Sequence, residues 1–182
     1  MTTPEAVLCP ERIDEDKKKT VLFVCTGNTC RSPMAAALFN HLYKDSCYHA
    51  ESAGIMCPDG DPIAENAAEA LMRRGVLPTP DNNYVCHRSR LINESIVKSS
   101  DLIVGLSSHH TVNIIVTFPM YVRSITSMPK NIADPFGGDL ATYEKCLASI
   151  EASLAEIFAL LENSAPTDGS CDDGTPDGGN DE

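Results

Sequence analysis

Short apolar runs alternate with helical segments along this chain, and this alternation limits its architecture more than any other feature. Residues 20–25 are a short, continuous apolar run, the pattern of a strand buried on both faces of a sheet, and residues 101–106 suit another buried strand. Residues 48–54 and 121–125 suit two further strands. The predicted helices cover residues 33–43, 64–74, 91–98, 109–118 and 140–161. Strands that alternate with helices predict an α/β fold: a four-stranded parallel sheet with helices on both faces.

Local signals mark the ends of two predicted helices. Ser32 and Pro33 stand at the N-cap and first helical position of the first helix. Gly75 follows the second helix as a C-terminal stop. In sheets of this kind, ligands bind outside the carboxyl ends of the strands. Because the first strand ends at Cys25, a ligand site is expected in the segment that follows it.

That segment carries the most chemical information in the sequence. It reads Cys25, Thr26, Gly27, Asn28, Thr29, Cys30, Arg31 and Ser32. A loop that leads into a helix N-terminus directs several backbone N–H groups at one point, with the positive end of the helix dipole behind them. Such a concavity binds a tetrahedral oxyanion. We therefore predict a phosphate-binding loop after the first strand, formed by residues 26–32.

Side chains of this loop suit a reaction at phosphorus. Arg31 offers a planar fork that matches two phosphate oxygens. Cys25 begins the loop, so its sulfur is expected at the floor, where the helix dipole and the guanidinium favour the thiolate. A thiolate beneath a bound phosphoryl group is placed for in-line attack on phosphorus. Gly27 permits a close backbone approach, and Asn28 tolerates a left-handed conformation.

Alternative roles for these residues have less support. A cysteine is more often a small buried apolar residue than a nucleophile, and this Cys–Arg spacing alone occurs by chance in many proteins. No Gly-Lys-Ser or Gly-Lys-Thr ends the segment, which excludes a Walker-type loop. Cys25 and Cys30 have no second ligand pair at zinc-site spacing. We expect neither a metal nor a cofactor.

The chemistry needs a group that donates a proton to the leaving group and later activates water. A carboxylic acid can do both in turn. Asp134 is the candidate, because it lies in a Pro/Gly-rich loop, residues 133–138, after a predicted strand. Asp-Pro is also a common turn starter. From the residues alone, the catalytic and the structural role of Asp134 both stay open.

Charge and composition limit the partners and the domain organisation. The net charge of −12 argues against binding to nucleic acid or to an anionic membrane, because both require a basic surface. Residues 164–182 carry six acidic residues and no basic one, and we expect a disordered acidic tail there. Residues 1–18 are expected to form a flexible arm, and residues 19–163 the folded domain. Without a membrane-length apolar run or a signal segment, we expect a cytoplasmic protein with reduced cysteines.

The segment from Val24 to Met34 resembles the phosphate-binding loop of the low-molecular-weight protein phosphatase family. The resemblance covers roughly residues 19–162. It includes a turn with Ser-Ala-Gly at residues 51–54 and a His-containing segment at residues 87–91. It also includes a third strand with its helix at residues 101–110 and a general-acid loop at residues 134–135. It implies that Cys25 is the nucleophile, that Arg31 binds the phosphate, and that Asp134 is the acid and then the base. It also implies that Ser32 stabilises the thiolate and Asn28 holds the loop.

Two positions bear on the substrate. Thr29 stands where tyrosine-directed members commonly have a larger aliphatic residue, and Phe136 lies in an Asp-Pro-Phe-Gly-Gly loop; both are similar to the bacterial protein arginine phosphatases. A phosphoguanidinium is polar and cationic, so a hydroxyl from Thr29 and the carboxylate of Asp134 would suit it. Alternatively, the Thr29 hydroxyl bonds locally to backbone. The first hypothesis is therefore a phosphatase that hydrolyses phosphoarginine on phosphorylated proteins through a cysteinyl-phosphate, and the alternative is a tyrosine phosphatase.

Two further hypotheses are weaker. An arsenate reductase on this fold should carry a relay pair of cysteines near the third strand, and residues 106–110 contain none. A non-catalytic phosphate-binding module would not need Cys25, Arg31 and Asp134 together. The spacing of Cys25 and Cys30, together with the family pattern, also suggests a reversible disulfide between them under peroxide. The oligomeric state stays open.

Overall fold

A four-stranded parallel sheet forms the centre of the computed structural model, which describes residues 18–164. The strand order is β2-β1-β3-β4, and all neighbouring strands run parallel, which confirms the predicted α/β fold. The strands are β1 (Lys19–Cys25), β2 (Tyr48–Gly54), β3 (Leu102–Gly105) and β4 (Ile125–Ser127). Residues 165–182 of the predicted acidic tail, and the predicted arm up to residue 17, lie outside the described residues, whereas Ser164 is the last residue of α5.

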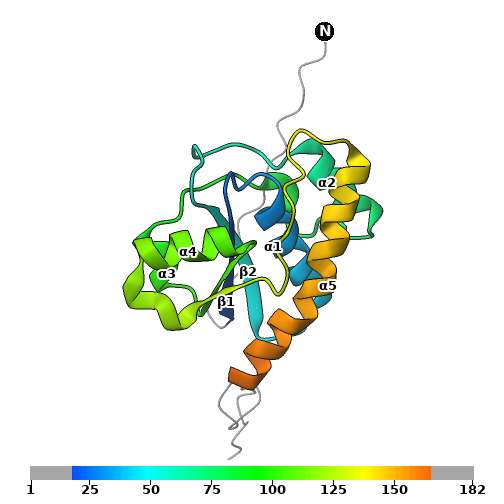
Figure 1. Ribbon diagram of the computed structural model, residues 1–182. Coiled ribbons are helices and arrows are strands. Elements are labelled where there is room, and N and C mark those ends of the chain that lie inside the picture. Colours follow the sequence, from blue (N-terminus) through cyan, green and yellow to red (C-terminus); the bar gives the residue numbers. More distant parts are fainter. Residues whose placement is uncertain (1–17, 165–182) are drawn as a thin grey trace, which may run out of the picture.

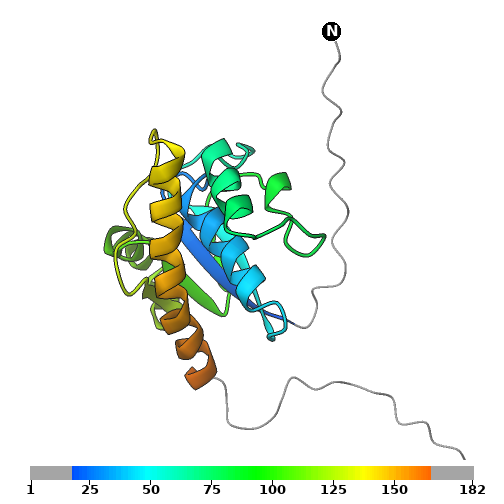
Figure 2. The same cartoon turned by 90° about the vertical axis from the view of Figure 1, so that its right-hand side faces the viewer.

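Helices cover both faces of the sheet, as predicted (Figures 1 and 2). They are α1 (Arg31–Leu42), α2 (Glu65–Arg73), α3 (Glu94–Lys98), α4 (Ser108–Thr117) and α5 (Leu140–Ser164), with 3-10 turns η1 (Tyr84–Cys86) and η2 (Pro119–Ser124). Side chains of β1 alternate between the two layers because successive strand residues point to opposite faces. Phe23 faces the core under α1, α2 and α5, and Val24 faces the core under α3 and α4. No helix within residues 18–164 has the length and apolarity to cross a bilayer.

The predicted position of the fourth strand is wrong. Residues 121–125 fall almost entirely in η2, and β4 comes after it. The Tyr121 N–H donates to the Phe118 carbonyl at 3.1 Å, which continues the turn at the end of α4. Strand pairing begins only at Ile125, opposite Ile103. The segment is apolar, as a strand would be, but its backbone N–H groups bond to carbonyls a few residues earlier and not to a neighbouring strand.

The boundaries of two helices follow from local chemistry. The Asn93 side chain accepts a hydrogen bond from the Ile96 N–H at 3.0 Å, so α3 begins at Glu94 and not at the predicted residue 91. The Ile92 N–H is outside the helix and donates to the Gly54 carbonyl at 2.9 Å. Gly75, with a φ of 87°, follows α2 as predicted.

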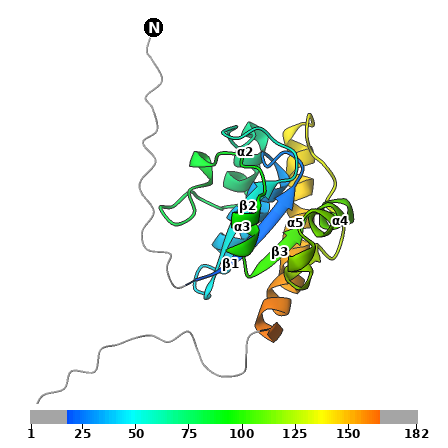
Figure 3. The same ribbon diagram turned by 90° about the vertical axis from the view of Figure 1, so that its left-hand side faces the viewer.

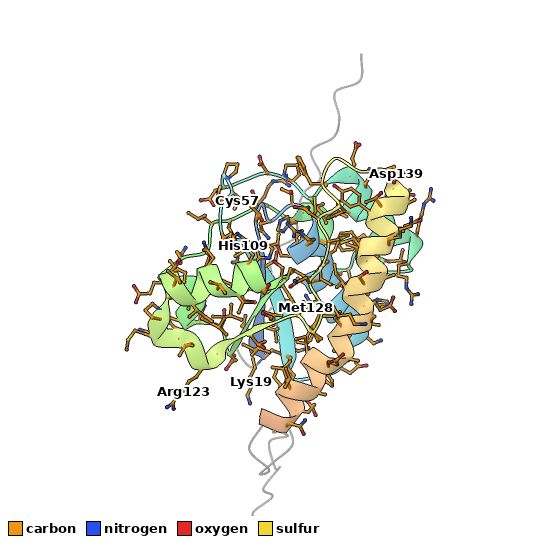
Figure 4. The ribbon with its side chains drawn as sticks, in the orientation of Figure 1. Lys19, Cys57, His109, Arg123, Met128 and Asp139 are labelled. Carbon is orange, nitrogen blue, oxygen red and sulfur yellow. The ribbon has the colours of Figure 1, made fainter. Side chains whose placement is uncertain are left out.

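The loops at the carboxyl ends of the strands meet on one side of the sheet (Figure 4). There Cys57, His109 and Asp139 mark the segments after β2, β3 and β4, whereas Lys19 lies at the opposite end. The α4 helix lies against β3 (Figure 3), and Gly105 permits this contact, since a Cβ there would be 2.7 Å from the Thr111 backbone nitrogen. The start of α4 is thereby brought beside the loop that follows β1.

Candidate active site

The loop after β1 is held by the side chain of Asn28. Its backbone is left-handed, with a φ of 52°, as the sequence predicts for an asparagine in a tight loop. The Asn28 amide nitrogen donates to the hydroxyls of Ser32 and Ser52, each at 2.9 Å, and its oxygen accepts from the Arg90 N–H at 3.0 Å. The His87 ring lies 2.6 Å from the Asn28 carbonyl. The loop therefore keeps its curvature through contacts with β2 and with the segment before α3.

The prediction that Ser32 caps the first helix is wrong. α1 begins at Arg31, and its N-cap residue, Cys30, makes no capping bond with its side chain. Pro33 is accordingly the third helical residue. The Ser32 hydroxyl instead lies 3.0 Å from the Cys25 sulfur. Asn28 donates to the Ser32 oxygen, and the Ser32 hydroxyl hydrogen has two acceptors within reach, the Cys25 sulfur and, at 3.3 Å, the Ala53 carbonyl.

The guanidinium of Arg31 is buried, with only 7% of the residue exposed. Its Nη2 donates to the Asp134 carboxylate at 2.6 Å, and its Nη1 lies 3.5 Å from the Ile132 carbonyl. The Arg31 Nε has no hydrogen-bond partner in the described part of the chain. A buried unpaired donor is costly, especially on a charged group. The Arg31 Nε–H is therefore a donor that can still accept a ligand as its partner.

Asp134 meets the loop from the segment between β4 and α5, as the sequence predicts. Its side chain is 52% exposed, so one oxygen can contact Arg31 while the carboxyl group remains open to a leaving group. The Phe136 N–H donates to the other Asp134 oxygen at 3.2 Å. The Phe136 ring is 79% exposed and forms part of the outer surface beside Asp134.

The remaining loop residues differ in exposure and contacts. Thr26, Gly27 and Thr29 are half-buried, and a Cβ on Gly27 would lie 3.7 Å from the Thr29 hydroxyl oxygen. That hydroxyl has a long contact of 3.6 Å to the Cys30 sulfur. Cys30 is buried and faces α5, where its sulfur lies 3.3 Å from the Tyr143 hydroxyl. Cys30 thus anchors the loop to α5, while the Thr29 side chain stays partly exposed.

Sequence reasoning missed two anchors of the loop. The Thr26 hydroxyl lies 3.0 Å from Nε2 of His110 on α4, and Tyr143 contacts Cys30 from α5. The polar residues 107–110, which follow strand β3, are a signal for the first anchor, because β3 lies next to β1 and both strands end at the same edge of the sheet. No comparable signal exists for Tyr143, which has the spacing of an ordinary core residue. Among residues 18–164, no three His, Cys, Asp or Glu side chains gather where they could hold a metal ion.

The pH dependence of stability should reflect His110. Burial, followed by the nearby charge of Arg31, lowers its pKa from 6.5 to about 4; His109 lowers it further, and Asp134 opposes the shift. Since the unfolded chain takes up the proton first, this contribution to stability is complete above about pH 6.5 and is lost as the pH falls towards 4. Between pH 7 and about pH 4.5, the wild type should lose about 2 kcal/mol more of its unfolding free energy than His110→Gln. Urea unfolding at both pH values checks this, and equal losses in the two proteins would contradict it.

Known proteins share this fold and this loop. The sequence profile described as low molecular weight phosphotyrosine protein phosphatase matches residues 20–166. A protein-arginine-phosphatase of Bacillus subtilis is 28% identical, over 78% of this chain and 96% of that protein. Arsenate reductase 1 of Staphylococcus epidermidis is 33% identical, over 79% of this chain and 97% of that protein.

Structural similarity supports the same assignment. The structure of a low molecular weight protein tyrosine phosphatase from T. tengcongensis matches with a TM-score of 0.72 and 29% identity, covering 79% of this chain and 99% of that one. The profile spans the loop after β1, the sheet and the Asp134 segment. This chain belongs to the low molecular weight phosphotyrosine protein phosphatase family, whose members are cysteine-dependent phosphatases.

Proposed function

We propose that this chain hydrolyses phosphoarginine on proteins through a cysteinyl-phosphate intermediate. The observation that carries the phosphate chemistry is the buried Nε of Arg31, the first residue of α1, which has no hydrogen-bond partner among the described residues. A phosphoryl oxygen placed in the loop would accept from this N–H and from backbone N–H groups.

In the first step, the Cys25 thiolate attacks phosphorus opposite the leaving group. The Ser32 hydroxyl, 3.0 Å from the sulfur, donates to the thiolate and holds it for attack. A bond forms between sulfur and phosphorus, and the bond from phosphorus to the leaving nitrogen breaks. Asp134 supplies the proton that this nitrogen needs. With this proton the arginine side chain leaves as a guanidinium, the Asp134 carboxyl becomes a carboxylate, and the phosphoryl group stays on Cys25.

In the second step, water replaces the leaving group. The Asp134 carboxylate takes a proton from the water as its oxygen attacks phosphorus, and the Cys25–phosphorus bond breaks. The products are inorganic phosphate and the Cys25 thiolate, and Asp134 ends in its acid form. Arg31 and the loop N–H groups stabilise the charge on the phosphoryl oxygens in both steps.

The choice of phosphoarginine rests on Thr29 and on similarity. The Thr29 hydroxyl is half-buried and has only the long contact to Cys30 within the described residues. It can therefore bond to a polar guanidinium group. The relative from Bacillus subtilis is named a protein-arginine-phosphatase. The second candidate is phosphotyrosine hydrolysis, favoured by the exposed Phe136 ring, which could pack on a phenyl group.

The test compares kcat/KM on two matched peptides, one with phosphoarginine and one with phosphotyrosine, with Cys25→Ser as the blank. A clear preference for the phosphoarginine peptide supports the proposal. Preference for phosphotyrosine would refute the substrate class and leave the phosphate chemistry standing. Reduction of arsenate is measured in a third assay. Activity in that assay and on neither peptide would favour an arsenate reductase. Activity in none of the three assays would favour a binding module.

Thr29→Ile should shift the substrate preference towards phosphotyrosine. The change removes a hydroxyl that can bond to the guanidinium and adds an apolar surface that suits a ring. We expect the ratio of kcat/KM values to move by about tenfold, the effect of one hydrogen bond to a charged group. Thr29→Ser, which keeps the hydroxyl, is the matched control and should retain the wild-type ratio. An unchanged ratio in Thr29→Ile would show that Thr29 plays no part in specificity.

We also propose that Cys25 and Cys30 form a reversible disulfide. Hydrogen peroxide would oxidise the Cys25 thiolate to a sulfenic acid, and Cys30 would then attack this sulfur with loss of water. Activity should fall in peroxide and return with dithiothreitol in the wild type. In Cys30→Ser, excess peroxide should oxidise the unprotected sulfenic acid further to a sulfinic acid, which dithiothreitol does not reduce, so activity should not return. Irreversible loss of activity in mild peroxide, unchanged by Cys30→Ser, would contradict the pairing.

A further inference from the structure

His110 lies on α4, outside the loop, yet its ring contacts the first residue after Cys25. Its Nε2 is 3.0 Å from the Thr26 hydroxyl oxygen, and its Nδ1 is 2.8 Å from the Ser107 hydroxyl oxygen. His110 is only 2% exposed, so water competes poorly for either nitrogen. One imidazole ring therefore joins the turn after β3 to the loop after β1.

Ser107 occupies an N-cap position but does not cap the helix. A serine there usually accepts a bond from a backbone N–H two or three residues later. No such side-chain bond forms at the start of α4, and the Asn131 side chain accepts from the Ser108 N–H at 2.8 Å. The Ser107 hydroxyl is paired with the His110 ring instead.

Thr26 is held from two sides. Its hydroxyl contacts His110, and its carbonyl accepts from the Met56 N–H at 3.1 Å. Gly54 leaves room for this carbonyl, because a Cβ on Gly54 would lie 2.6 Å from it. The backbone contact comes from the segment after β2 and the side-chain contact from α4, so the two anchors are independent.

The charge state of the ring suits a structural link beside a cation. Burial and the charge of Arg31 lower the pKa of His110 to about 4, so the ring is neutral near pH 7. His109 and Asp134 are the other charged or titratable groups that act on it. A neutral imidazole donates at one nitrogen and accepts at the other. Both neighbouring hydroxyls can match either arrangement.

We infer that His110 is a positioning residue that acts through the Thr26 hydroxyl to hold the beginning of the phosphate-binding loop over Cys25. The inference rests on the proposed phosphatase function. It predicts that the Thr26 contact matters to turnover, and that the Ser107 contact serves only to orient the ring. Without the link, the loop N–H groups would be less well ordered when the phosphoryl group is transferred.

Two substitutions at residue 110 separate these contacts. The amide of glutamine can reach the place of Nε2 and meet Thr26, whereas the shorter asparagine can replace only Nδ1 and meet Ser107. With para-nitrophenyl phosphate as substrate, His110→Asn should lower kcat by about tenfold with little change in KM, and His110→Gln should keep most of the activity. Thr26→Val, which removes the hydroxyl, should lower kcat as much as His110→Asn does. Thr26→Ser, which keeps the hydroxyl, should have a higher kcat than Thr26→Val.

The double variant Thr26→Val with His110→Asn tests whether the two residues act as one unit. It should be no slower than the slower single variant. Losses in kcat that add in the double variant would overturn the inference. It would also be overturned if His110→Asn and His110→Gln lost kcat equally, in proportion to their loss of unfolding free energy. If His110→Asn does not fold, the comparison of Thr26→Val with Thr26→Ser decides the matter, and equal kcat values there refute the link.

The same series distinguishes failure of the inference from failure of the proposed function. Wild-type hydrolysis that persists in Cys25→Ser would refute the cysteine mechanism itself. Hydrolysis that requires Cys25 but is unaffected by Thr26→Val would refute only the role of His110.

Discussion

Cys25→Ser is expected to abolish turnover while leaving the fold intact. A serine hydroxyl is almost entirely protonated near pH 7 and is a far weaker nucleophile than a thiolate, and the Ser32 hydroxyl, 3.0 Å from the Cys25 sulfur, is not a base that could activate it. Loss of the nucleophile in enzymes of covalent mechanism costs at least about 10⁴-fold in kcat. Release of phosphate from a phosphopeptide is the measurement.

The matched control for this variant is Cys57→Ser. The Cys57 sulfur lies beside Gly54, which is the register partner of Cys25, so the change affects a thiol next to the loop and not in it. We expect near wild-type turnover there. Inorganic phosphate should still bind to Cys25→Ser, because the Arg31 donors and the loop N–H groups remain. Substantial turnover by Cys25→Ser would remove Cys25 from the mechanism.

Asp134→Asn is expected to slow hydrolysis by about 10²–10⁴-fold when the leaving group needs a proton. Asparagine keeps an oxygen that can accept from Arg31, as the carboxylate does at 2.6 Å, but it cannot donate and then remove a proton as an acid–base pair. The loss should be small for para-nitrophenyl phosphate, whose leaving group is stable as an anion, and large for a simple alkyl phosphate. A series of leaving groups measured by kcat shows this dependence.

Asp139→Asn is the matched control for Asp134→Asn. Asp139 lies at the start of α5 and accepts from the Thr142 N–H at 2.9 Å, a capping role that asparagine fills equally well. Its activity should equal that of the wild type. Equal rates for the wild type and Asp134→Asn on an alkyl phosphate would show that Asp134 is not the acid.

The loop after β1 illustrates how much of the site can be predicted from sequence. A buried strand, a Gly/Asn turn and a helix start are neighbours in the chain, so their joint geometry is local and residues 25–32 predict it. The parallel sheet is equally predictable, since the alternation of strands and helices leaves few other arrangements. The same local reasoning misplaced Ser32, because its hydroxyl bonds to Cys25 and Asn28 and not to the helix backbone.

Contacts between distant segments were decided only by the tertiary structure. Asp134 reaches Arg31 across 103 positions, and His110 reaches Thr26 across 84, because the strands that precede these segments end at the same edge of the sheet. The unpaired Arg31 Nε is likewise visible only when every neighbour is in place. Residue order thus determined the strand–loop–helix unit. Packing decided which remote side chains complete it, because burial and hydrogen-bond geometry depend on all the elements together.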